Sequence, residues 1–367
     1  MALWNGTELD GLVLQAGTLT LRPWQPSDAA EVSRLMADDR IGRYLDVPRP
    51  YRASDAAEFI AGPGTNGRRD GSGLDCAITR NIDGALLGSA RLGLAPGGGE
   101  IGYWVAAEHW RQGIATEAVR TLSRFGFAHG LARIQISCDR ANAASAGVAL
   151  KAGYRYEGIA RAGRLRRGES VDLAVFGRVP ADDGEPVEPS WPPLPELSDG
   201  VVGIRPMLAE DWPTVLAEGS NPESVGWGFT GEPMTEAIAR RRTAGAGLDR
   251  LVGRSVELLI CDAATGTGAG TMSLRWEGPP GVIGIGYGIV PEFRGRRFTA
   301  RALRLISDWA LESIAVRMEL GCKTANIASA KSAEAAGFVV DSHHPSRLRN
   351  PDGSYSDEIG FCRIRGS

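Results

Sequence analysis

A loop between a predicted strand and a predicted helix carries the residues that first suggest chemistry. The chain runs from Gly102 through Gly113 and Ala115 to Ala118, so small residues stand where the helix begins. Such a loop directs several backbone N–H groups to one point, and the helix N-terminus adds positive potential. A pyrophosphate fits this arrangement, although the sequence matches neither G-x-x-x-x-G-K-[ST] nor G-x-G-x-x-G. An ordinary strand–helix turn accounts for the same residues equally well.

The elements that position this loop occur twice. Short segments of the first half return in the second half at an offset of 183 or 184 residues. The matched pairs are Leu19–Pro23 with Val202–Pro206, Ile101–Tyr103 with Ile285–Tyr287, Cys138 with Cys322, Asn142–Ser145 with Asn326–Ser329, and Ala152–Tyr154 with Ala336–Phe338. The chain is therefore predicted to contain a duplicated domain.

Each copy is predicted to follow the order β-α-α-β-β-β-α-β-α-β-β, which indicates a mixed α/β sheet. Apolar periodicity and the Gly and Asn boundary signals define the ranges. In the first copy the strands are 18–22, 75–80, 85–94, 100–106, 132–138, 154–160 and 171–178, and the helices are 28–36, 56–60, 113–129 and 142–151. Further strands are predicted in the second copy at 255–262, 268–276, 282–290 and 317–323. Sheets of this kind bind ligands at strand ends and helix N-termini.

A proline-rich, acidic stretch separates the copies. Its prolines include Pro186, Pro189, Pro192, Pro193 and Pro195. Proline fixes an extended backbone, so this stretch is predicted to be a semi-rigid linker over 180–199. Trp191 within it is expected to pack against one domain. The predicted domains are therefore 1–179, the N-terminal and catalytic one, and 200–367, the C-terminal one.

Composition excludes several classes of protein. A chain of 367 residues, 43% hydrophobic and 23% charged, is typical of a soluble protein of about two domains. No apolar run reaches the ~18 residues that span a membrane, and Met1–Asn5 lack the pattern of a secretory signal. The net charge of −3 argues against a large nucleic-acid surface. We therefore expect a cytoplasmic protein with neither a membrane nor a nucleic-acid partner; the sequence leaves its oligomeric state open.

The sulfur and imidazole side chains suggest no metal chemistry. The chain has five cysteines and four histidines, without C-x-x-C pairs or metal-ligand spacing. We expect reduced thiols and no metal site. Cys138 and Cys322 stand in the same predicted strand of each copy, where burial as small apolar side chains explains them better than nucleophilic catalysis.

The loop resembles the acyl-CoA loop of the GNAT acetyltransferase superfamily, which is written Q/R-x-x-G-x-G/A. Gly113 and Ala115 supply the G-x-A part, whereas Trp110 stands at the first position. An aromatic residue there is similar to the RimJ/RimL branch, which acetylates protein N-termini. Because the resemblance covers nearly the whole chain twice, it implies an α/β (α+β) fold of two tandem GNAT-like domains. Each would be a mixed, mostly antiparallel twisted sheet flanked by helices.

Two further segments resemble the same branch. One is the strand Glu100–Trp104, and the other is Asn142–Ser145 followed by Lys151–Tyr154. Many GNAT proteins carry a tyrosine acid at the position of Ala149, and the second copy has Ala333 there. Tyrosine-acid catalysis at that position is therefore excluded.

The resemblance implies which residues bind acetyl-CoA. The CoA pyrophosphate would be held by the N–H groups of Arg111, Gln112, Gly113, Ile114, Ala115 and Thr116. The strand backbone at Trp104 and Val105 would pair with the pantetheine arm and polarise the thioester carbonyl, which is usually the largest catalytic contribution. Asn142 and Ser145 would lie beside the pantetheine and the thiol.

The resemblance also implies two catalytic residues. Glu100 would remove a proton from the incoming ammonium, directly or through water. The alternative for Glu100 is a solvated carboxylate near a strand end. Ser145 would hydrogen-bond the departing thiolate, and its alternative is a local helix-cap hydroxyl.

The second copy departs from the first at these positions. Gly284 replaces Glu100, and Arg297 and Thr299 replace the two small loop residues. Arg294 restores the first loop position, and Glu277 is expected to be at best a distant substitute for the missing carboxylate. We therefore expect weak or absent CoA binding in the second copy.

The predicted activity is acetyl-CoA-dependent transfer of an acetyl group to a primary amine. The favoured acceptor is the α-amine of a protein or peptide N-terminus, because an α-amine is far more often neutral than a lysine at neutral pH. An amino-bearing small molecule or antibiotic is the alternative acceptor. A non-catalytic tandem binding module is the alternative function.

Overall fold

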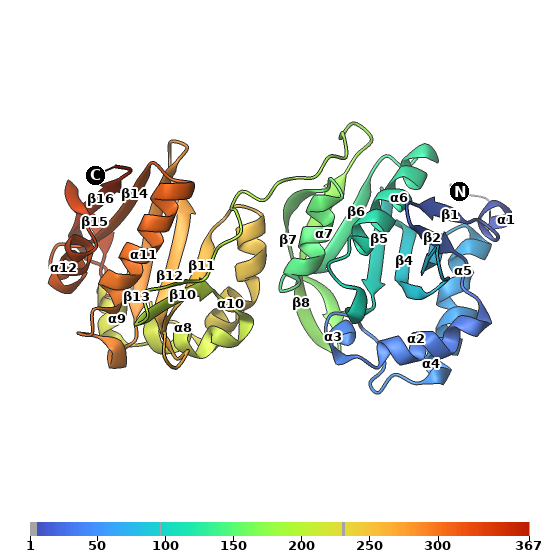
Figure 1. The fold of residues 1–367 in the computed structure, drawn as a ribbon, viewed down its shortest axis with the longest axis horizontal. Coiled ribbons are helices and arrows are strands. Elements are labelled where there is room, and N and C mark those ends of the chain that lie inside the picture. Colours follow the sequence, from blue (N-terminus) through green and yellow to red (C-terminus); the bar gives the residue numbers. More distant parts are fainter. Residues whose placement is uncertain (1–5, 96, 230–231, 367) are drawn as a thin grey trace. The chain divides into compact units, whose positions relative to one another are not determined.

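The chain forms two compact units, Met1–Glu188 and Pro189–Ser367, called unit 1 and unit 2 below (Figure 1). The computed structural model describes residues 6–95, 97–229 and 232–366, so Met1–Asn5 lie outside the described residues. Each unit contains one eight-stranded sheet with flanking helices. The predicted α/β fold of two tandem domains, each a mixed and mostly antiparallel sheet, is confirmed.

The sheet of unit 1 has the strand order β1-β2-β3-β4-β5-β6-β8-β7. Its strands are β1 (Leu14–Ala16), β2 (Leu19–Arg22), β3 (Gly73–Arg80), β4 (Leu86–Ala95), β5 (Gly98–Val105), β6 (Ile134–Asp139), β7 (Arg155–Arg166) and β8 (Glu169–Arg178). All neighbours are antiparallel except β5 and β6, which are parallel. The one parallel pair therefore lies in the interior of the sheet.

Helices connect and cover these strands. They are α1 (Gly6–Leu9), α2 (Ala29–Met36), α3 (Asp39–Gly42), α4 (Ala53–Ala61), α5 (Pro63–Asp70), α6 (Ile114–Ala128) and α7 (Ala143–Lys151). The long helix α6 buries a stripe that includes Ala118, Val119 and Leu122. It follows β5 after a short 3-10 turn (Ala107–His109) and a loop, so its N-terminus lies near the carboxyl end of that strand.

The structure adds elements that the sequence did not predict. The short elements α1, β1, α3 and α5 were not predicted, and β7 continues to Arg166, beyond the predicted end at 160. The sequence of α5 contains Gly64, Asn66 and Gly67, which are weak helix formers, so its local pattern is not helical.

Unit 2 repeats the arrangement with the strand order β15-β16-β14-β13-β12-β11-β10-β9. Its strands are β9 (Leu197–Ser198), β10 (Val202–Pro206), β11 (Val256–Asp262), β12 (Gly268–Trp276), β13 (Val282–Ile289), β14 (Arg317–Lys323), β15 (Val339–Arg349) and β16 (Tyr355–Ile364). Its helices are α8 (Trp212–Gly219), α9 (Pro222–Trp227), α10 (Glu236–Leu251), α11 (Phe298–Ser313) and α12 (Ile327–Ala335). Again one interior pair, β13 and β14, is parallel.

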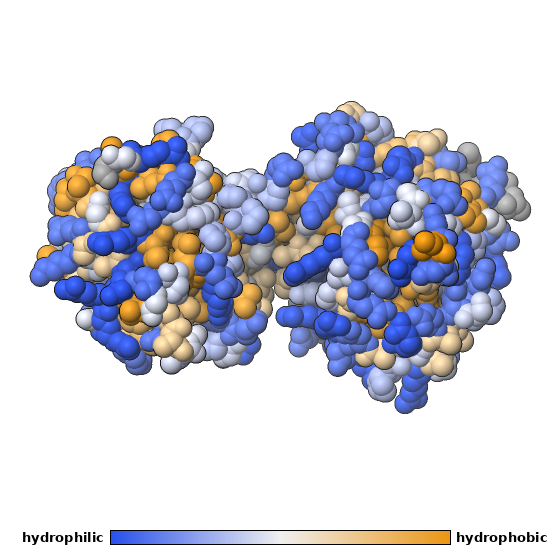
Figure 2. Space-filling model, in the orientation of Figure 1, coloured by the Kyte–Doolittle hydropathy of each residue, from blue (hydrophilic) through white to orange (hydrophobic). Residues whose placement is uncertain are grey.

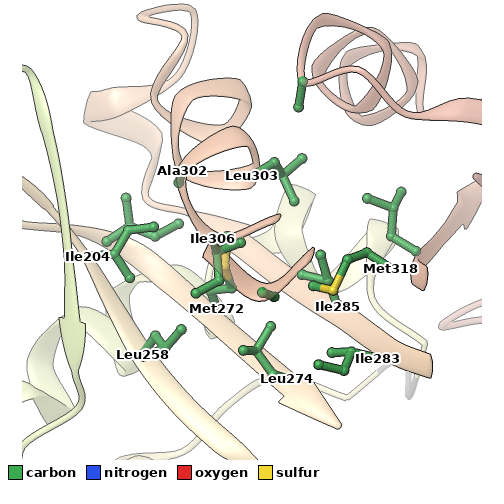
Figure 3. Close-up of a cluster of buried hydrophobic side chains, with 14 of the residues drawn as sticks. Ile204, Leu258, Met272, Leu274, Ile283, Ile285, Ala302, Leu303, Ile306 and Met318 are labelled. Atoms are coloured by element: carbon green, nitrogen blue, oxygen red, sulfur yellow. The ribbon is translucent and has the colours of Figure 1, made fainter. Parts of the chain in front are cut away.

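The core of unit 2 lies between the sheet and α11. Figure 3 shows Leu258, Met272 and Ile283, from three neighbouring strands, together with Leu303 and Ile306 of α11. These five side chains are at most 1% exposed. Removing such apolar surface from water is the main stabilising contribution to the fold.

Trp191 belongs to this core although it lies in the proline-rich stretch. Its side chain is fully buried and stacks on Trp276, with 4.5 Å between ring centroids. The stretch after Glu188 is therefore packed onto unit 2.

Hydrophilic residues cover most of the face in Figure 2. Among the described residues, no helix combines the length and apolarity needed to cross a bilayer.

Candidate active site

A gap opens between the two parallel strands of unit 1. β5 and β6 pair only at Gly99 with Ile134 and at Glu100 with Gln135. Beyond Glu100, β5 continues for five residues beside β4 alone. One edge of β5 is therefore left without a strand partner, and an extended ligand could pair with it as a strand would.

The alternation of the strand decides which backbone groups face this gap. The N–H of Ala106 donates to the carbonyl of Leu87 in the β3–β4 hairpin, at 2.8 Å. Since neighbouring residues of a strand point their backbone groups to opposite sides, Trp104 faces β4, and Tyr103 and Val105 face the gap. The indole of Trp110 donates to the Val105 carbonyl at 2.8 Å. The N–H groups of Tyr103 and Val105 are therefore the ones placed to meet a carbonyl in the gap.

Two residues of the loop before α6 have a left-handed backbone conformation. Arg111 has φ 63° and Gly113 has φ 79°. The N–H of Glu117 makes the first bond of the helix, to the Gly113 carbonyl at 3.0 Å. No side chain caps the helix at Gly113, so the N–H groups of the first turn are available to an anion.

A pocket of about 460 Å³ lies at this helix terminus. Four of the six predicted loop residues line it, namely Gln112, Gly113, Ile114 and Thr116. Two cationic residues that the sequence analysis did not select, Arg120 and Lys151, also line it, together with one carboxylate, Glu117, which forms an ion pair with Arg124. A Cβ added at Gly113 would meet no protein atom within 4 Å, so the space beside this glycine is open to a ligand. These features fit a polyphosphate.

Ser145 and Tyr103 form a hydrogen-bonded pair across the sheet–helix boundary. Their hydroxyl oxygens are 2.8 Å apart, and burial raises the pKa of Tyr103 far above its usual value. The Asn142 side chain caps α7 by accepting from the Ser145 N–H at 3.1 Å. The Ser145 hydroxyl is thus not the cap of this helix, and it is held in place by a phenol that stays protonated.

Glu100 lies apart from this pair. It is half-buried, and the period of the strand places its side chain on the same face as Trp104, opposite to Tyr103. Trp104 packs against the apolar cluster that includes Val32 and Leu35 of α2. Glu100 and Tyr103 are three positions apart in the strand, which is roughly 10 Å. A proton leaving the amine would therefore reach Glu100 through water.

Residues of a different kind stand at the carboxyl end of β6. The Tyr44 hydroxyl donates to the carbonyl of Ala141 at 3.1 Å. Asp139, the last residue of β6, forms an ion pair with Arg166 of β7. Arg166 also lies over the Tyr44 ring, 5.8 Å from its centroid. These residues form a wall over the end of the strand.

Unit 2 keeps part of this geometry. Tyr287 and Ser329 form the equivalent hydroxyl pair, again at 2.8 Å, and Asn326 caps α12 as Asn142 caps α7. Among the positions that change, Lys151 of the first pocket is replaced by Ala335. Unit 2 therefore keeps the serine–tyrosine pair and loses one cation beside the loop.

The expectation that Glu277 is a distant substitute for the missing carboxylate is wrong. Its Oε1 lies 2.4 Å from the position that a Cβ on Gly284 would take. Glu277 follows β12 and leans across to β13, so unit 2 has a carboxylate at the strand position that corresponds to Glu100. The difference between the units therefore lies elsewhere, in the loop and around it.

The Arg294 guanidinium is engaged by other residues of unit 2 and is not free to bind a phosphate at the loop. It forms an ion pair with Glu223 and donates to the Ser224 hydroxyl at 2.9 Å, so its guanidinium is bound to the first turn of α9. Glu218 of α8 leans over Gly288, the residue that replaces Trp104. Burial raises the pKa of Glu218. Both side chains are committed to contacts within unit 2.

Both halves of the chain match one family of known proteins. Residues 18–155 and 202–339 match the family described as Acetyltransferase (GNAT) domain, and together the two segments make up more than half of the chain. The chain belongs to this family. It is a GNAT N-acetyltransferase with tandem domains, as the loop and the repeated segments predicted.

Relatives and solved structures each match one half of the chain. YdaF of Bacillus subtilis (strain 168), provisionally named a ribosomal N-acetyltransferase, is 30% identical over 165 residues, which are 43% of this chain and 89% of YdaF. A Salmonella typhimurium structure, described as an acetyltransferase that modifies the N-terminal serine of ribosomal protein L7/L12, is 20% identical. It covers 46% of this chain and 99% of its own, with a TM-score of 0.42.

A GNAT homologue has been solved with the acyl donor bound. The Microcin C7 self immunity acetyltransferase MccE, in complex with acetyl-CoA and AMP, is 24% identical. It covers 44% of this chain and 93% of its own, with a TM-score of 0.41. GNAT homologues thus bind acetyl-CoA.

Sequence reasoning missed Tyr103 as a site residue, although a signal was present. The Ile-Gly-Tyr segment is one of the pairs that recur in both halves, yet its tyrosine was not connected to Ser145, 42 residues away. No local sequence pattern indicates that Tyr44 or Arg166 belongs to the site, because only the folded chain places them at the end of β6.

Proposed function

We propose that unit 1 transfers the acetyl group of acetyl-CoA to an α-amine at a protein or peptide N-terminus. The observation that carries this proposal is the pairing of two features in one unit. The loop at Gly113 leaves its N–H groups open beside a cationic pocket, and the free edge of β5 runs from there past the Tyr103–Ser145 pair.

The donor would lie along that path. The N–H groups from Arg111 to Thr116 would hold the pyrophosphate, and Lys151 supplies a nearby positive charge. The gap-facing N–H groups of Tyr103 and Val105 would bind the pantetheine arm and the thioester oxygen. Donors fixed in place before reaction stabilise the charge that develops on that oxygen.

The reaction needs a proton removed from the amine and the negative charge on the departing sulfur stabilised. The neutral amine attacks the thioester carbonyl, a C–N bond forms, and the C–S bond breaks to release the CoA thiolate. Glu100 takes the amine proton through water, and the Ser145 hydroxyl donates a hydrogen bond to the thiolate. Tyr103 holds Ser145 for this contact. The thiolate leaves easily because a thiol is already fairly acidic, with a pKa near 8.5.

The proposed general base, Glu100, favours an α-amine as acceptor because it acts only through water. With a pKa near 7.8, an α-amine is about one-third neutral at pH 7.5, whereas a lysine near 10.4 is about a thousandth neutral. A single carboxylate that acts through water suits the first group. The provisional name of YdaF supports the same acceptor class. An amino-bearing small molecule is the second candidate, because Tyr44 and Arg166 at the end of β6 could contact a compact amine as well as a peptide.

Thiol release from acetyl-CoA, measured with a panel of amines, tests the proposal. We expect turnover with short peptides that have free N-termini and none with the same peptides blocked by acetylation. Turnover with free lysine side chains alone, or with none of the amines, would contradict it. Titration calorimetry with CoA should give one tight site per chain. The reason is that unit 2 has Ala335 at the position where Lys151 lines the loop pocket of unit 1.

A further inference from the structure

Arginines are concentrated in the hairpin that β7 and β8 form in unit 1. Arg161, Arg164 and Arg166 lie in β7, and Arg167 begins the turn. Except for Arg166, these side chains are exposed. Arg43, directly after α3, is also exposed. The five residues come from two segments that are far apart in the sequence.

Specific contacts hold these two segments together over the end of β6. Arg167 donates to the Gly42 carbonyl at 2.9 Å, which ties the hairpin to α3; Figure 1 shows α3 beside β8. Arg43 and Arg166 both lie over the Tyr44 ring, at 5.5 and 5.8 Å from its centroid. The arginines therefore border one region of unit 1.

This region adjoins the place where the acyl group would be transferred. Arg166 pairs with Asp139, and Tyr44, whose ring Arg166 covers, donates to the Ala141 carbonyl. Asn142 follows directly and caps α7 at Ser145. Arg164 lies two residues before Arg166 in β7, on the same face of the strand. The positive charge of the region therefore lies beside the N-terminus of the helix that carries the thiolate-binding residue.

Acidic side chains neutralise the region only in part. Asp139 forms an ion pair with Arg166, and Asp172 lies within the hairpin, where its bond to the N–H of Ala162 at 3.0 Å does not cancel its charge. Glu169, at the start of β8, is exposed at the hairpin tip. Among the described residues, no carboxylate forms an ion pair with Arg43, Arg161 or Arg164. Three cations therefore face solvent beside the reaction site.

Unit 2 lacks this feature at the equivalent positions. At the 184-residue offset, Arg161, Arg164, Arg166 and Arg167 become Pro345, Leu348, Asn350 and Pro351. Leu348 is 7% exposed, so it serves the interior of unit 2. The hairpin of unit 2 has arginines at other positions, namely Arg347, which forms an ion pair with Glu358, and Arg349. The arrangement at positions 161, 164, 166 and 167 thus occurs in the unit that keeps Lys151 and the open loop, which argues that it serves the acceptor of that unit.

We propose that the acceptor of unit 1 carries an anionic group, a carboxylate or a phosphate, within a few residues of its amine, and that Arg43 and Arg164 bind it. The inference rests on the proposed transfer to an N-terminal α-amine and names the acceptor class. Arginine suits this task because its planar fork binds carboxylate and phosphate groups with two hydrogen bonds. Acidic peptide N-termini are the expected substrates.

Binding of labelled peptides tests the proposal independently of turnover. Peptides that begin with Ser and continue with Asp, Asn, Lys or phosphoserine at the second and third positions are titrated against the full chain with CoA present, using fluorescence anisotropy. We expect the Asp peptide to bind about fivefold more tightly than the Asn peptide. Added salt should reduce this difference. A larger gain for phosphoserine than for Asp would identify a phosphate as the preferred group.

Three variants and a control locate the effect. Arg164→Gln and Arg43→Gln should each remove most of the preference for Asp over Asn, and Arg164→Glu should reverse it towards Lys. Arg69→Gln should not change it, because Arg69 is an exposed arginine of α5, which packs on the distant strand β3. Equal affinities for the Asp and Asn peptides, or an equal effect of Arg69→Gln, would overturn the inference.

Thiol release with the same peptides separates this inference from the proposed reaction. If acidic peptides bind preferentially and no peptide is acetylated, the transfer reaction is refuted and the anion-binding surface stands. If peptides are acetylated at rates that do not depend on their charge, the surface is refuted and the reaction stands.

Discussion

Gly113 and Arg297 have the same left-handed backbone conformation at the same position of equivalent helices. Their φ angles are 79° and 62°, and each residue immediately precedes the first turn of its helix, α6 or α11. The order is reversed two residues earlier, where Arg111 has φ 63° and Gly295 has φ 72°. The loop therefore keeps its shape in both units, although each unit has a glycine at only one of the two left-handed positions.

Replacing Arg297 by glycine should stabilise unit 2. A left-handed conformation costs an L-residue about 1–2 kcal/mol, and glycine avoids that cost while losing more entropy on folding. We expect Arg297→Gly to raise the free energy of unfolding of unit 2 by about 1 kcal/mol. Amide exchange of peptides from α11, followed in urea, measures it. A lower stability of the variant would show that the arginine side chain supports the loop.

Gly113→Arg should weaken CoA binding to unit 1. The backbone tolerates an arginine there, as Arg297 shows, so the effect comes from a side chain placed in the open space beside the loop. We expect at least a roughly tenfold loss of affinity, or about 1.4 kcal/mol, by calorimetry. Gly130→Arg is the matched control, since Gly130 also has a positive φ and open space but follows the other end of α6. Equal losses in both variants would refute the role of the loop.

Glu100→Gln should slow turnover and leave CoA affinity nearly intact. A general base contributes about 10²–10⁴-fold to a rate, and the amide cannot accept the proton. The comparison needs a pH at which most of the acceptor amine is protonated. Glu277→Gln asks the same question of unit 2, because its carboxylate lies beside Gly284. If only Glu277→Gln reduced turnover, the catalytic unit would be unit 2.

Tyr103→Phe should lower kcat with little change in KM for acetyl-CoA. The phenol holds the Ser145 hydroxyl at 2.8 Å, and losing that contact leaves the hydroxyl free to rotate away from the thiolate. We expect a decrease of about tenfold, the equivalent of one hydrogen bond to a charged group. Tyr287→Phe removes the matched pair in unit 2 and should not change kcat. A change in KM alone would assign Tyr103 to binding.

Asp75 should make unit 1 less stable as the pH rises from 4 to 6. Burial raises the pKa of this β3 carboxyl to about 6, and the charges of Arg91 and Arg68 oppose the shift only partly. Between the unfolded and folded pKa values the native state binds more protons, so stability decreases with increasing pH.

The variant Asp75→Asn should lack this pH dependence. Its free energy of unfolding should improve relative to the wild type by roughly 2 kcal/mol between pH 4 and pH 7. Amide exchange of β3 peptides at several pH values measures the difference. Parallel pH profiles for the two proteins would show that Asp75 ionises normally.

The repeated segments made the fold predictable. The Asn142–Ser145 segment predicted a cap, and the cap is present in both units because an Asn side chain reaches the N–H three residues later regardless of its surroundings. The short helices α3 and α5 were missed because tertiary packing, rather than local propensity, forms helices of this length.

The site was less predictable because its contacts join distant segments. Alternation along β5, read from a single bond of Ala106, decides that Tyr103 rather than Trp104 faces the gap. Likewise, Glu277 reaches Gly284 from a neighbouring strand, and only the register of β12 on β13 reveals this. Residue types at a motif suggest a chemistry, whereas pairing between strands decides which groups meet.

The carbonyl near the end of one short helix receives a cation in both units, but from different residues. Arg167 of the hairpin donates to Gly42 in unit 1, while the buried Lys323 of β14 donates to Gly226 at 2.7 Å in unit 2. Pro351 stands at the hairpin position where unit 1 has Arg167. The donor to this carbonyl is thus a hairpin residue in unit 1 and a residue of an inner strand in unit 2. A substitution at the hairpin tip of unit 2 should therefore leave this contact intact, whereas a shorter or apolar side chain at position 323 would remove the donor to the Gly226 carbonyl.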